Sequence, residues 1–184
     1  MRVIAGTAKS LRLKTIEGME TRPTTDRIKE TLFNMINPYI RGTRFLDLFA
    51  GSGGIGIEAL SRGASEAVFI DSNKKCVECI KHNLKFTKLE DRASVYCNTA
   101  TSAIHMMEDE DPFDYIFMDP PYDNLYEKDI IMMLDHSELV DEDTVIVVEA
   151  SLDTDFDYVE EDTDFEVYKE KKYKSNKHVF IRKK

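Results

Sequence analysis

The stretch Phe45-Leu46-Asp47-Leu48-Phe49-Ala50-Gly51-Ser52-Gly53-Gly54-Ile55-Gly56 decides the fold of this chain. An apolar run leads into a loop whose glycines have the spacing G-x-G-x-x-G, and an amphipathic pattern follows. This order is typical of the turn from a parallel strand into its helix, where glycines let a ligand approach the backbone closely. The stretch therefore predicts a nucleotide-like ligand at the carboxyl end of a parallel strand.

Apolar runs alternate with amphipathic patterns along the rest of the chain, which favours an α/β fold with a mostly parallel sheet and helices on both faces. The last two apolar runs, 165–168 and 179–181, have no helical pattern between them, so they are expected to pair antiparallel at one edge of the sheet. Strands are expected near residues 44–49, 67–71, 93–97, 113–118 and 144–149, and helices near 53–62, 73–87, 99–107 and 126–134.

The 184 residues fit a single domain, 1–184, with a substantial core. Residues 1–22 are expected to form a basic N-terminal β-hairpin whose first strand is Arg2–Gly6, and residues 23–184 a Rossmann-like core. Pro23-Thr24-Thr25-Asp26 supplies the residue types that start a helix. No repeat or linker divides the chain.

Charge is segregated along the chain, whose net charge is −10. Residues 105–166 contain one Lys against 23 acids, whereas residues 167–184 contain eight basic residues against one acid, and residues 1–44 contain nine against four. If the two basic ends meet in space, they form a face that can contact nucleic-acid phosphates. The alternative is that both are only solvated termini.

No apolar run approaches the roughly 18 residues of a membrane span, and no signal peptide opens the chain. Three cysteines do not suggest a disulfide framework. The reducing cytoplasm is therefore the expected location, and no membrane partner is predicted.

The stretch Cys76-Val77-Glu78-Cys79 imitates a metal or redox motif. Its cysteines share an apolar helix stripe with Ile80 and Leu84, and no second CxxC follows, so both are expected in the core and no metal is predicted. Cys97 alternates with Val95 on a strand and is expected in the core as well. The histidines form no spaced cluster, so we do not expect a catalytic histidine.

Asp119-Pro120-Pro121-Tyr122 follows the apolar run Tyr115-Ile116-Phe117-Met118. The two prolines remove backbone donors and leave a stiff turn that offers only carbonyl oxygens. A carboxylate before the turn and an aromatic ring after it suit a planar NH₂ group, because the carboxylate and a proline carbonyl accept its hydrogens while the ring stacks on the base. The alternative is a Pro-Pro turn with a capping Asp.

Two acids flank the glycine loop, and they help to distinguish the cofactor. The glycine spacing with Asp71 further along also fits an NAD enzyme. Asp47, however, would repel a pyrophosphate, whereas it can accept hydrogen bonds around the cationic amino-acid part of S-adenosylmethionine. Asp71 is expected to bind the ribose hydroxyls, unless Asp71-Ser72-Asn73 is only a helix N-cap.

Together these residues resemble the RsmD family of bacterial 16S rRNA (guanine-N2)-methyltransferases. The resemblance runs nearly end to end, through the segments 2–6, 22–34, 45–53 and 119–122, of which 22–34 is the most specific. It implies a class I methyltransferase fold, with a seven-stranded sheet whose last strand is antiparallel. The implied activity is methyl transfer from S-adenosylmethionine to the N2 amine of one guanine, and the implied partner is 16S rRNA within a small-subunit assembly intermediate. A monomer is expected.

The resemblance also assigns roles. Asp119 and the Pro120 carbonyl are expected to hold the guanine amine, mainly by positioning, because an ordinary carboxylate pKa makes Asp119 a weak base at neutral pH. The expected catalytic residues are Asp119, Pro120, Pro121 and Tyr122; the cofactor-binding residues are Asp47, Ala50, Gly51, Ser52, Gly53, Gly56, Asp71, Ser72, Asn98 and Thr99; and the RNA-binding residues are Arg2, Arg12, Lys14, Arg22, Thr24, Thr25 and Arg27.

Several alternatives stay open at the level of sequence. Arg22, Thr24, Thr25 and Arg27 can instead cap the cofactor pocket, and the two threonines can be simple helix caps. A methyltransferase acting on adenine N6 or on a protein glutamine would share the loop and the Pro-Pro turn. A non-catalytic RNA-binding module would need only the basic ends. The sequence does not identify the guanine or the state of the rRNA substrate.

Overall fold

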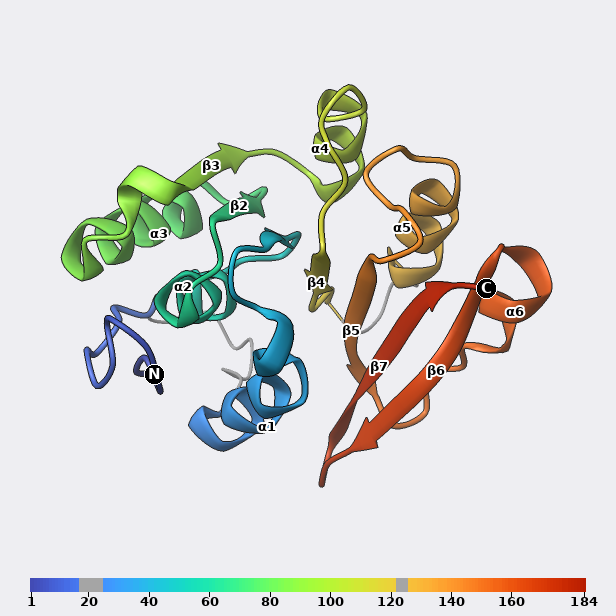
Figure 1. Cartoon of the computed structure of the whole chain (residues 1–184), viewed down its shortest axis with the longest axis horizontal. Helices are drawn as coiled ribbons and strands as arrows, with labels where there is room; N and C mark the ends of the chain where they lie inside the picture. Colours follow the sequence, from blue (N-terminus) through green and yellow to red (C-terminus); the bar gives the residue numbers. More distant parts are fainter. Residues whose placement is uncertain (17–24, 122–125) are drawn as a thin grey trace.

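The computed structural model describes residues 1–16, 25–121 and 126–184 (Figure 1). Three of the expected site residues, Arg22, Thr24 and Tyr122, lie outside this part of the chain. The strands are β1 (Arg44–Asp47), β2 (Glu66–Asp71), β3 (Ala93–Cys97), β4 (Tyr115–Met118), β5 (Val145–Ser151), β6 (Phe165–Lys172) and β7 (Asn176–Lys183). The α-helices are α1 (Asp26–Ile36), α2 (Gly54–Arg62), α3 (Lys74–Thr87), α4 (Ala100–Met106), α5 (Tyr126–Asp135) and α6 (Asp157–Asp162), with short 3₁₀ turns η1 (Asn37–Tyr39) and η2 (Glu90–Arg92).

One seven-stranded sheet runs through the described residues in the order β3-β2-β1-β4-β5-β7-β6. The neighbours from β3 to β5 are parallel, and β7 is antiparallel to both β5 and β6. The predicted α/β fold with an antiparallel last strand is confirmed. The sequence missed α6, a six-residue acidic helix that buries only Val159 and so has no repeated apolar pattern.

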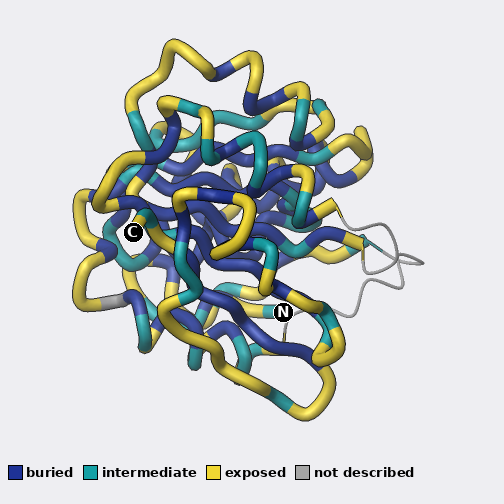
Figure 2. Tube along the Cα trace, turned by 90° about the vertical axis from the view of Figure 1, so that its right-hand side faces the viewer, coloured by how far each residue is buried: buried dark blue, intermediate teal, exposed yellow. Residues whose placement is uncertain are grey.

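The sheet is covered on both faces, which is why all four residues of the central strand β4 are apolar and buried (Figure 2). Leu46, Ile116 and Val148 pack into a core that includes residues of α4 and α5. Phe45 and Phe117 alternate onto the other face, in a core with residues of α1, α2 and α3. Side chains two residues apart on a strand lie on the same face of the sheet. Asp47 and Asp119, two residues after Phe45 and Phe117, are therefore expected on the face covered by α1 and α2.

The expected N-terminal hairpin is present but short: an antiparallel bridge joins Arg2 to Arg12, and the Val3 and Leu13 amides donate to the Leu11 and Met1 carbonyls. Beyond Val3, the described residues of this segment form no further bridge to a second strand. The segment instead packs against α2, where Gly6 has a φ of +81° and a Cβ atom would lie 1.8 Å from the Ser61 carbonyl oxygen. The predicted strand over Arg2–Gly6 therefore does not extend past Val3, because the backbone of Ile4 and Ala5 is bound by a side chain rather than by a second strand.

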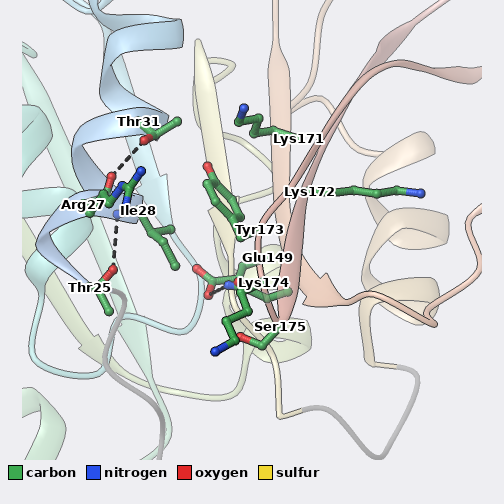
Figure 3. Close-up of a pocket in the computed structure, with 11 residues that line it drawn as sticks. Thr25, Arg27, Ile28, Thr31, Glu149, Lys171, Lys172, Tyr173, Lys174 and Ser175 are labelled. Atoms are coloured by element: carbon green, nitrogen blue, oxygen red, sulfur yellow. Dashed lines mark hydrogen bonds between the residues drawn. The ribbon is translucent and has the colours of Figure 1, made fainter.

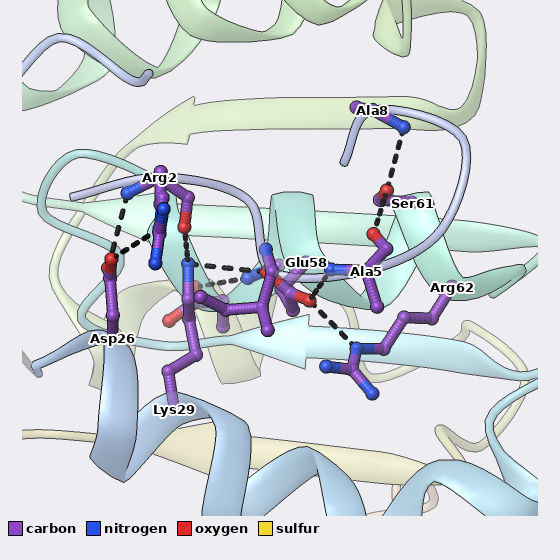
Figure 4. Close-up of polar contacts among 11 residues, drawn as sticks. Arg2, Ala5, Ala8, Asp26, Lys29, Glu58, Ser61 and Arg62 are labelled. Atoms are coloured by element: carbon purple, nitrogen blue, oxygen red, sulfur yellow. Dashed lines mark hydrogen bonds and ion pairs between the residues drawn. The ribbon is translucent and has the colours of Figure 1, made fainter. Parts of the chain in front are cut away.

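That side chain is Glu58, which is fully buried at the centre of a cluster between α1, α2 and the N-terminal segment (Figure 4). Its Oε2 accepts hydrogen bonds from the Ile4 amide at 2.8 Å and from Lys29 Nζ at 3.3 Å. Its Oε1 accepts from the Ala5 amide at 3.0 Å and from Arg62 Nε at 2.8 Å. This Glu58 cluster ties the start of the chain to the core.

Cys76 and Cys79 are buried, as predicted, but Cys97 is exposed. The prediction for Cys97 was wrong because β3 is an edge strand and its last residues are exposed. Over the described ranges, no helix is long and apolar enough to cross a membrane, and no group of three or more His, Cys, Asp or Glu residues could hold a metal ion.

Candidate active site

Asp47 lies at the end of β1, beneath the glycine loop, and is 1% exposed. Its Oδ2 accepts a hydrogen bond from the Gly56 amide at 3.1 Å, in the first turn of α2. Burial raises the pKa of Asp47 to about 7; the Gly56 hydrogen bond opposes this shift and the charge of Asp71 adds to it. Asp47 therefore fixes the start of α2 against the sheet.

Asp71 ends β2 and holds the loop from the other side. Its Oδ2 accepts from the Gly51 amide at 2.9 Å, and its Oδ1 accepts from the Asn73 amide at 2.8 Å. The N-cap of α3 is Asn73, whose side chain accepts from the Lys75 amide. Asp71 is therefore not the N-cap itself, and its half-buried carboxylate keeps lone pairs for a further donor.

The three fingerprint glycines are needed for different reasons. At Gly51 the φ is +54° and a Cβ atom would meet nothing within 4 Å, so the backbone there faces open space. Gly53 has a φ of +80°, in the left-handed region that favours glycine. At Gly56 a Cβ atom would lie 2.3 Å from the Phe69 ring, so glycine lets α2 pack closely on β2. A ligand has room over Gly51.

The remaining expected cofactor residues lie around this loop. Asn98 follows β3, and its backbone amide donates to the backbone carbonyl of Asp71 at 3.1 Å, which puts the two residues side by side. Thr99 caps α4 by accepting from the Ser102 amide. The Ala50 amide donates to the Ile70 carbonyl, and the Ser52 and Ser72 carbonyls accept from Asn83 Nδ2 and Cys97 Sγ.

Asp119 follows β4 at the same edge of the sheet. The register pairs Phe117 with Asp47 on β1, and Met118 with Val148 on β5. Asp119 is thus flanked by the ends of two strands that both carry acids. Burial raises the pKa of Asp119 well above its usual range, and the charges of Glu149 and Asp47 raise it further. The expectation of an ordinary carboxylate pKa was wrong, because the sequence does not reveal this burial.

The two prolines follow Asp119, with Pro120 buried and Pro121 exposed. Neither has an amide hydrogen, so the turn presents carbonyl oxygens next to a carboxylate. The carboxylate and carbonyl acceptors required by the predicted amine site thus follow one another in the chain.

Sequence reasoning missed Glu149, which lies within the buried part of β5 and is 3% exposed. Its Oε1 accepts from Asn176 Nδ2 at 2.5 Å, and His178 Nε2 lies 3.2 Å from its Oε2. His178 Nδ1 in turn lies 3.1 Å from the Tyr173 hydroxyl. His178, which the sequence analysis did not single out, is thus paired with Glu149 across β7 and β5, and a catalytic role for histidine is still not expected. The available signal was an acid ending an apolar run, as in Asp47.

A pocket of about 570 Å³ lies between the start of α1 and the turn joining β6 to β7 (Figure 3). Glu149 and Asn176 line it, together with exposed basic side chains from both elements. Thr25 accepts from the Ile28 amide at 3.3 Å, so it caps α1 as well as lining the pocket. The residues that line it are Thr25, Arg27, Ile28, Thr31, Glu149, Lys171, Lys172, Tyr173, Lys174, Ser175 and Asn176.

The first turn of α1 has basic residues from both ends of the chain beside it. Arg2 Nε pairs with Asp26 Oδ2 at 3.0 Å, and Arg27 lines the pocket opposite Lys171. Arg12 and Lys14 are exposed on the N-terminal segment, which Asn83 binds through the Lys14 backbone. Arg2 is thus engaged by an acid, whereas Lys171 and Lys174 beside the pocket are exposed.

Comparisons with known proteins identify relatives of this chain. The family model described as conserved hypothetical protein 95 matches residues 1–182. The candidate rRNA methyltransferase YlbH of Bacillus subtilis is 48% identical over 150 residues, which cover 81% of this chain and 82% of that protein. Ribosomal RNA small subunit methyltransferase D of Haemophilus influenzae is 37% identical over 141 residues, covering 76% of this chain and 73% of that protein.

Among solved structures, the candidate methyltransferase yhhF of Escherichia coli superposes with a TM-score of 0.87. The two proteins are 29% identical, and the match covers 100% of this chain and 98% of the other. The fold and the order of its elements are thus shared over the whole chain.

Proposed function

This chain belongs to the RsmD family of rRNA methyltransferases, and from this premise we propose that it methylates the exocyclic N2 amine of a guanine in 16S rRNA, with S-adenosylmethionine as methyl donor. The observation that carries the proposal is the juxtaposition of the Asp119-Pro120-Pro121 turn with the glycine loop at one edge of the sheet. The loop leaves open space at Gly51, and the turn offers acceptors for an amine.

The residues around the loop fit the cofactor. Gly51 leaves open space above its backbone, and Asp71 beside it retains acceptor capacity for ribose hydroxyls. Asn98 lies next to Asp71, where its side chain would contact the adenine, while Asp47 holds the loop in shape from below. When bound, S-adenosylmethionine supplies a methyl group on a positively charged sulfur.

The Asp119 turn acts on the target amine. The lone pair of a guanine N2 is delocalised into the ring and is a poor nucleophile. Asp119 and the Pro120 carbonyl accept the two amine hydrogens and hold the nitrogen in line with the methyl group. As the new N–C bond forms, the surplus proton on nitrogen passes to the Asp119 carboxylate, and its raised pKa makes Asp119 a better acceptor than an ordinary aspartate.

The pocket beside this turn suits an RNA strand. Arg27, Lys171, Lys172 and Lys174 line it and are exposed, so their charges can meet phosphates while a base enters toward Glu149. Drawing the target nucleotide out of its stack gives the amine access to Asp119. The substrate we propose is rRNA within a small-subunit assembly intermediate.

Nucleoside mass spectrometry of 16S rRNA from cells with and without this gene tests the proposal. We expect one N2-methylguanosine to be lost in the deletion strain and restored by the wild-type gene. Loss of N6-methyladenosine, or of methylated glutamine in a protein, would instead support the alternative amine substrates. An unchanged methylation pattern would contradict the proposal.

A further inference from the structure

Hydrogen-bond acceptors gather where the pocket approaches the Asp119 turn. Met118 and Val148 are register partners on adjacent parallel strands, so Asp119 and Glu149, the next residues of the two strands, are neighbours. Asn176 faces the same pocket and is 5% exposed. Two carboxylates and an amide therefore lie together at low exposure.

The orientation of the amide is fixed by its partner. Asn176 Nδ2 must face Glu149 Oε1, since a carboxylate oxygen accepts only from the NH₂ end of the amide. The other end, Asn176 Oδ1, is buried and has no hydrogen-bond partner among the described residues. A buried acceptor without a donor is costly, which indicates that a ligand supplies donors here.

Glu149 is held in one position from two sides. Asn176 approaches its Oε1 and His178 its Oε2, while the Tyr173 hydroxyl lies at the other ring nitrogen of His178. A carboxylate has about four lone-pair sites and can accept more than two hydrogen bonds. A carboxylate fixed in this way can accept from a base that enters the pocket with its amine at Asp119.

We propose that Glu149 determines the specificity for guanine by accepting the N1–H of the target base, with Asn176 and His178 as positioning residues. This inference rests on the proposed function. The edge of guanine carries the N2 amine and the N1–H side by side, so two adjacent donors match two adjacent carboxylates. Adenine has a lone pair at N1 next to its amine. Its N1 would therefore meet the Glu149 carboxylate with no hydrogen between them, because both groups are acceptors.

The experiment uses a base that keeps the amine and lacks the N1 hydrogen. 2-Aminopurine replaces the target guanine in 16S rRNA, at the position found by mass spectrometry, and both RNAs are assembled into small-subunit particles. Methylation is then measured as kcat/KM with the wild-type protein, with Glu149→Gln and with the control Glu166→Gln. Glu166 pairs with Arg182 at the far end of β6, away from the pocket.

We expect the wild-type protein and Glu166→Gln to prefer guanine over 2-aminopurine by roughly 10- to 100-fold, the scale for leaving a buried acceptor unpaired. In Glu149→Gln this preference falls at least tenfold, because the new amide can donate to N1 of 2-aminopurine. A purely structural role would lower both rates equally and keep their ratio, which would overturn the inference.

The ratio of kcat/KM on guanine RNA to kcat/KM on 2-aminopurine RNA, measured with the wild-type protein, does not depend on how well any variant folds. Equal wild-type rates on the two substrates would exclude N1–H recognition while leaving the proposed function intact. Methylation of neither substrate would contradict the proposed function itself. Binding of S-adenosylhomocysteine by Glu149→Gln checks that the variant is folded.

Discussion

Glu58 and Glu149 are both buried glutamates, but their neighbours differ in kind (Figures 3 and 4). Glu58 meets the side-chain cations of Lys29 and Arg62 as well as two backbone amides. Glu149 accepts from an amide and a histidine and lies beside a second carboxylate, Asp119. The first environment supplies a donor to each oxygen from a charged side chain, whereas the second concentrates acceptors.

The difference between the two sites shows in the pKa shifts of their buried groups. At the Glu58 cluster burial lowers the pKa of Lys29, while Glu58 raises it, so the ion pair offsets part of the cost of burial. At the active site burial and a like charge both raise the pKa of Asp119. In the Glu58 cluster, paired opposite charges stabilise the fold. At the active site, the neighbouring carboxylates of Asp119 and Glu149 fit a substrate that supplies hydrogen-bond donors.

The largest effect is expected for breaking the Glu58 cluster. Lys29→Met leaves a buried carboxylate without one of its two cations, so the free energy of unfolding should fall by about 3 kcal/mol. Denaturant unfolding measures this change, and Lys81→Met on the exposed face of α3 is the matched control, expected within about 0.5 kcal/mol of wild type. Turnover per folded molecule should be unchanged. A stable but inactive Lys29→Met would contradict the separation of the two regions.

The reverse pattern is expected for Asp119→Ala. Turnover on rRNA should fall at least ~10²-fold, since one group that positions the amine in the transition state is lost. Affinity for S-adenosylmethionine, measured by calorimetry, should stay nearly unchanged because the glycine loop is intact. A variant that binds cofactor normally and keeps its turnover would show that the turn is only structural.

Asp71→Ala should act on cofactor binding. Loss of the carboxylate removes the bond to the Gly51 amide and the acceptor for the ribose, which should weaken binding by roughly 1–3 kcal/mol. Titration of S-adenosylmethionine measures the loss, and Asp91→Ala in the exposed turn η2 is the control. An unchanged affinity of Asp71→Ala for S-adenosylmethionine would show that Asp71 does not bind the ribose.

Finally, the pKa of Asp119 predicts a pH dependence. The carboxylate must be ionised to accept the amine hydrogens, and its folded pKa is raised, so turnover should fall as pH drops through that pKa, about tenfold per unit. Asp119→Asn cannot ionise and should lose this acid limb while keeping some positioning ability. If the limb persists in Asp119→Asn, it belongs to Asp47, whose pKa is about 7.

Sequence analysis could propose those candidate site residues that lie close together in the chain. Asp47 and the glycine loop span ten residues, and the Asp119 turn spans four, so spacing and residue type were sufficient to nominate them. The pairing of Glu149 with His178 depends on β7 inserting antiparallel beside β5, between β5 and β6. The spacing of residues along the chain does not predict the register between β5 and β7. The raised pKa of Asp119 depends on the same tertiary packing.

The N-terminal hairpin is shorter than predicted for a related reason. Its alternating pattern is typical of a hairpin, yet the Ile4 and Ala5 amides bond to Glu58, which lies on α2 and is more than fifty residues away in the chain. Local pattern indicates which backbone groups need partners, whereas tertiary packing decides whether a strand or a side chain supplies them.

The most direct test of the account is the product formed by purified protein. Small-subunit particles from cells lacking the gene are incubated with S-adenosylmethionine and either wild-type protein or Asp119→Ala, and the rRNA nucleosides are analysed by mass spectrometry. The account predicts N2-methylguanosine at one 16S position with wild-type protein and at least ~10²-fold less with the variant. Methylation at N7, N1 or a ribose hydroxyl, or an equally active Asp119→Ala, would contradict it.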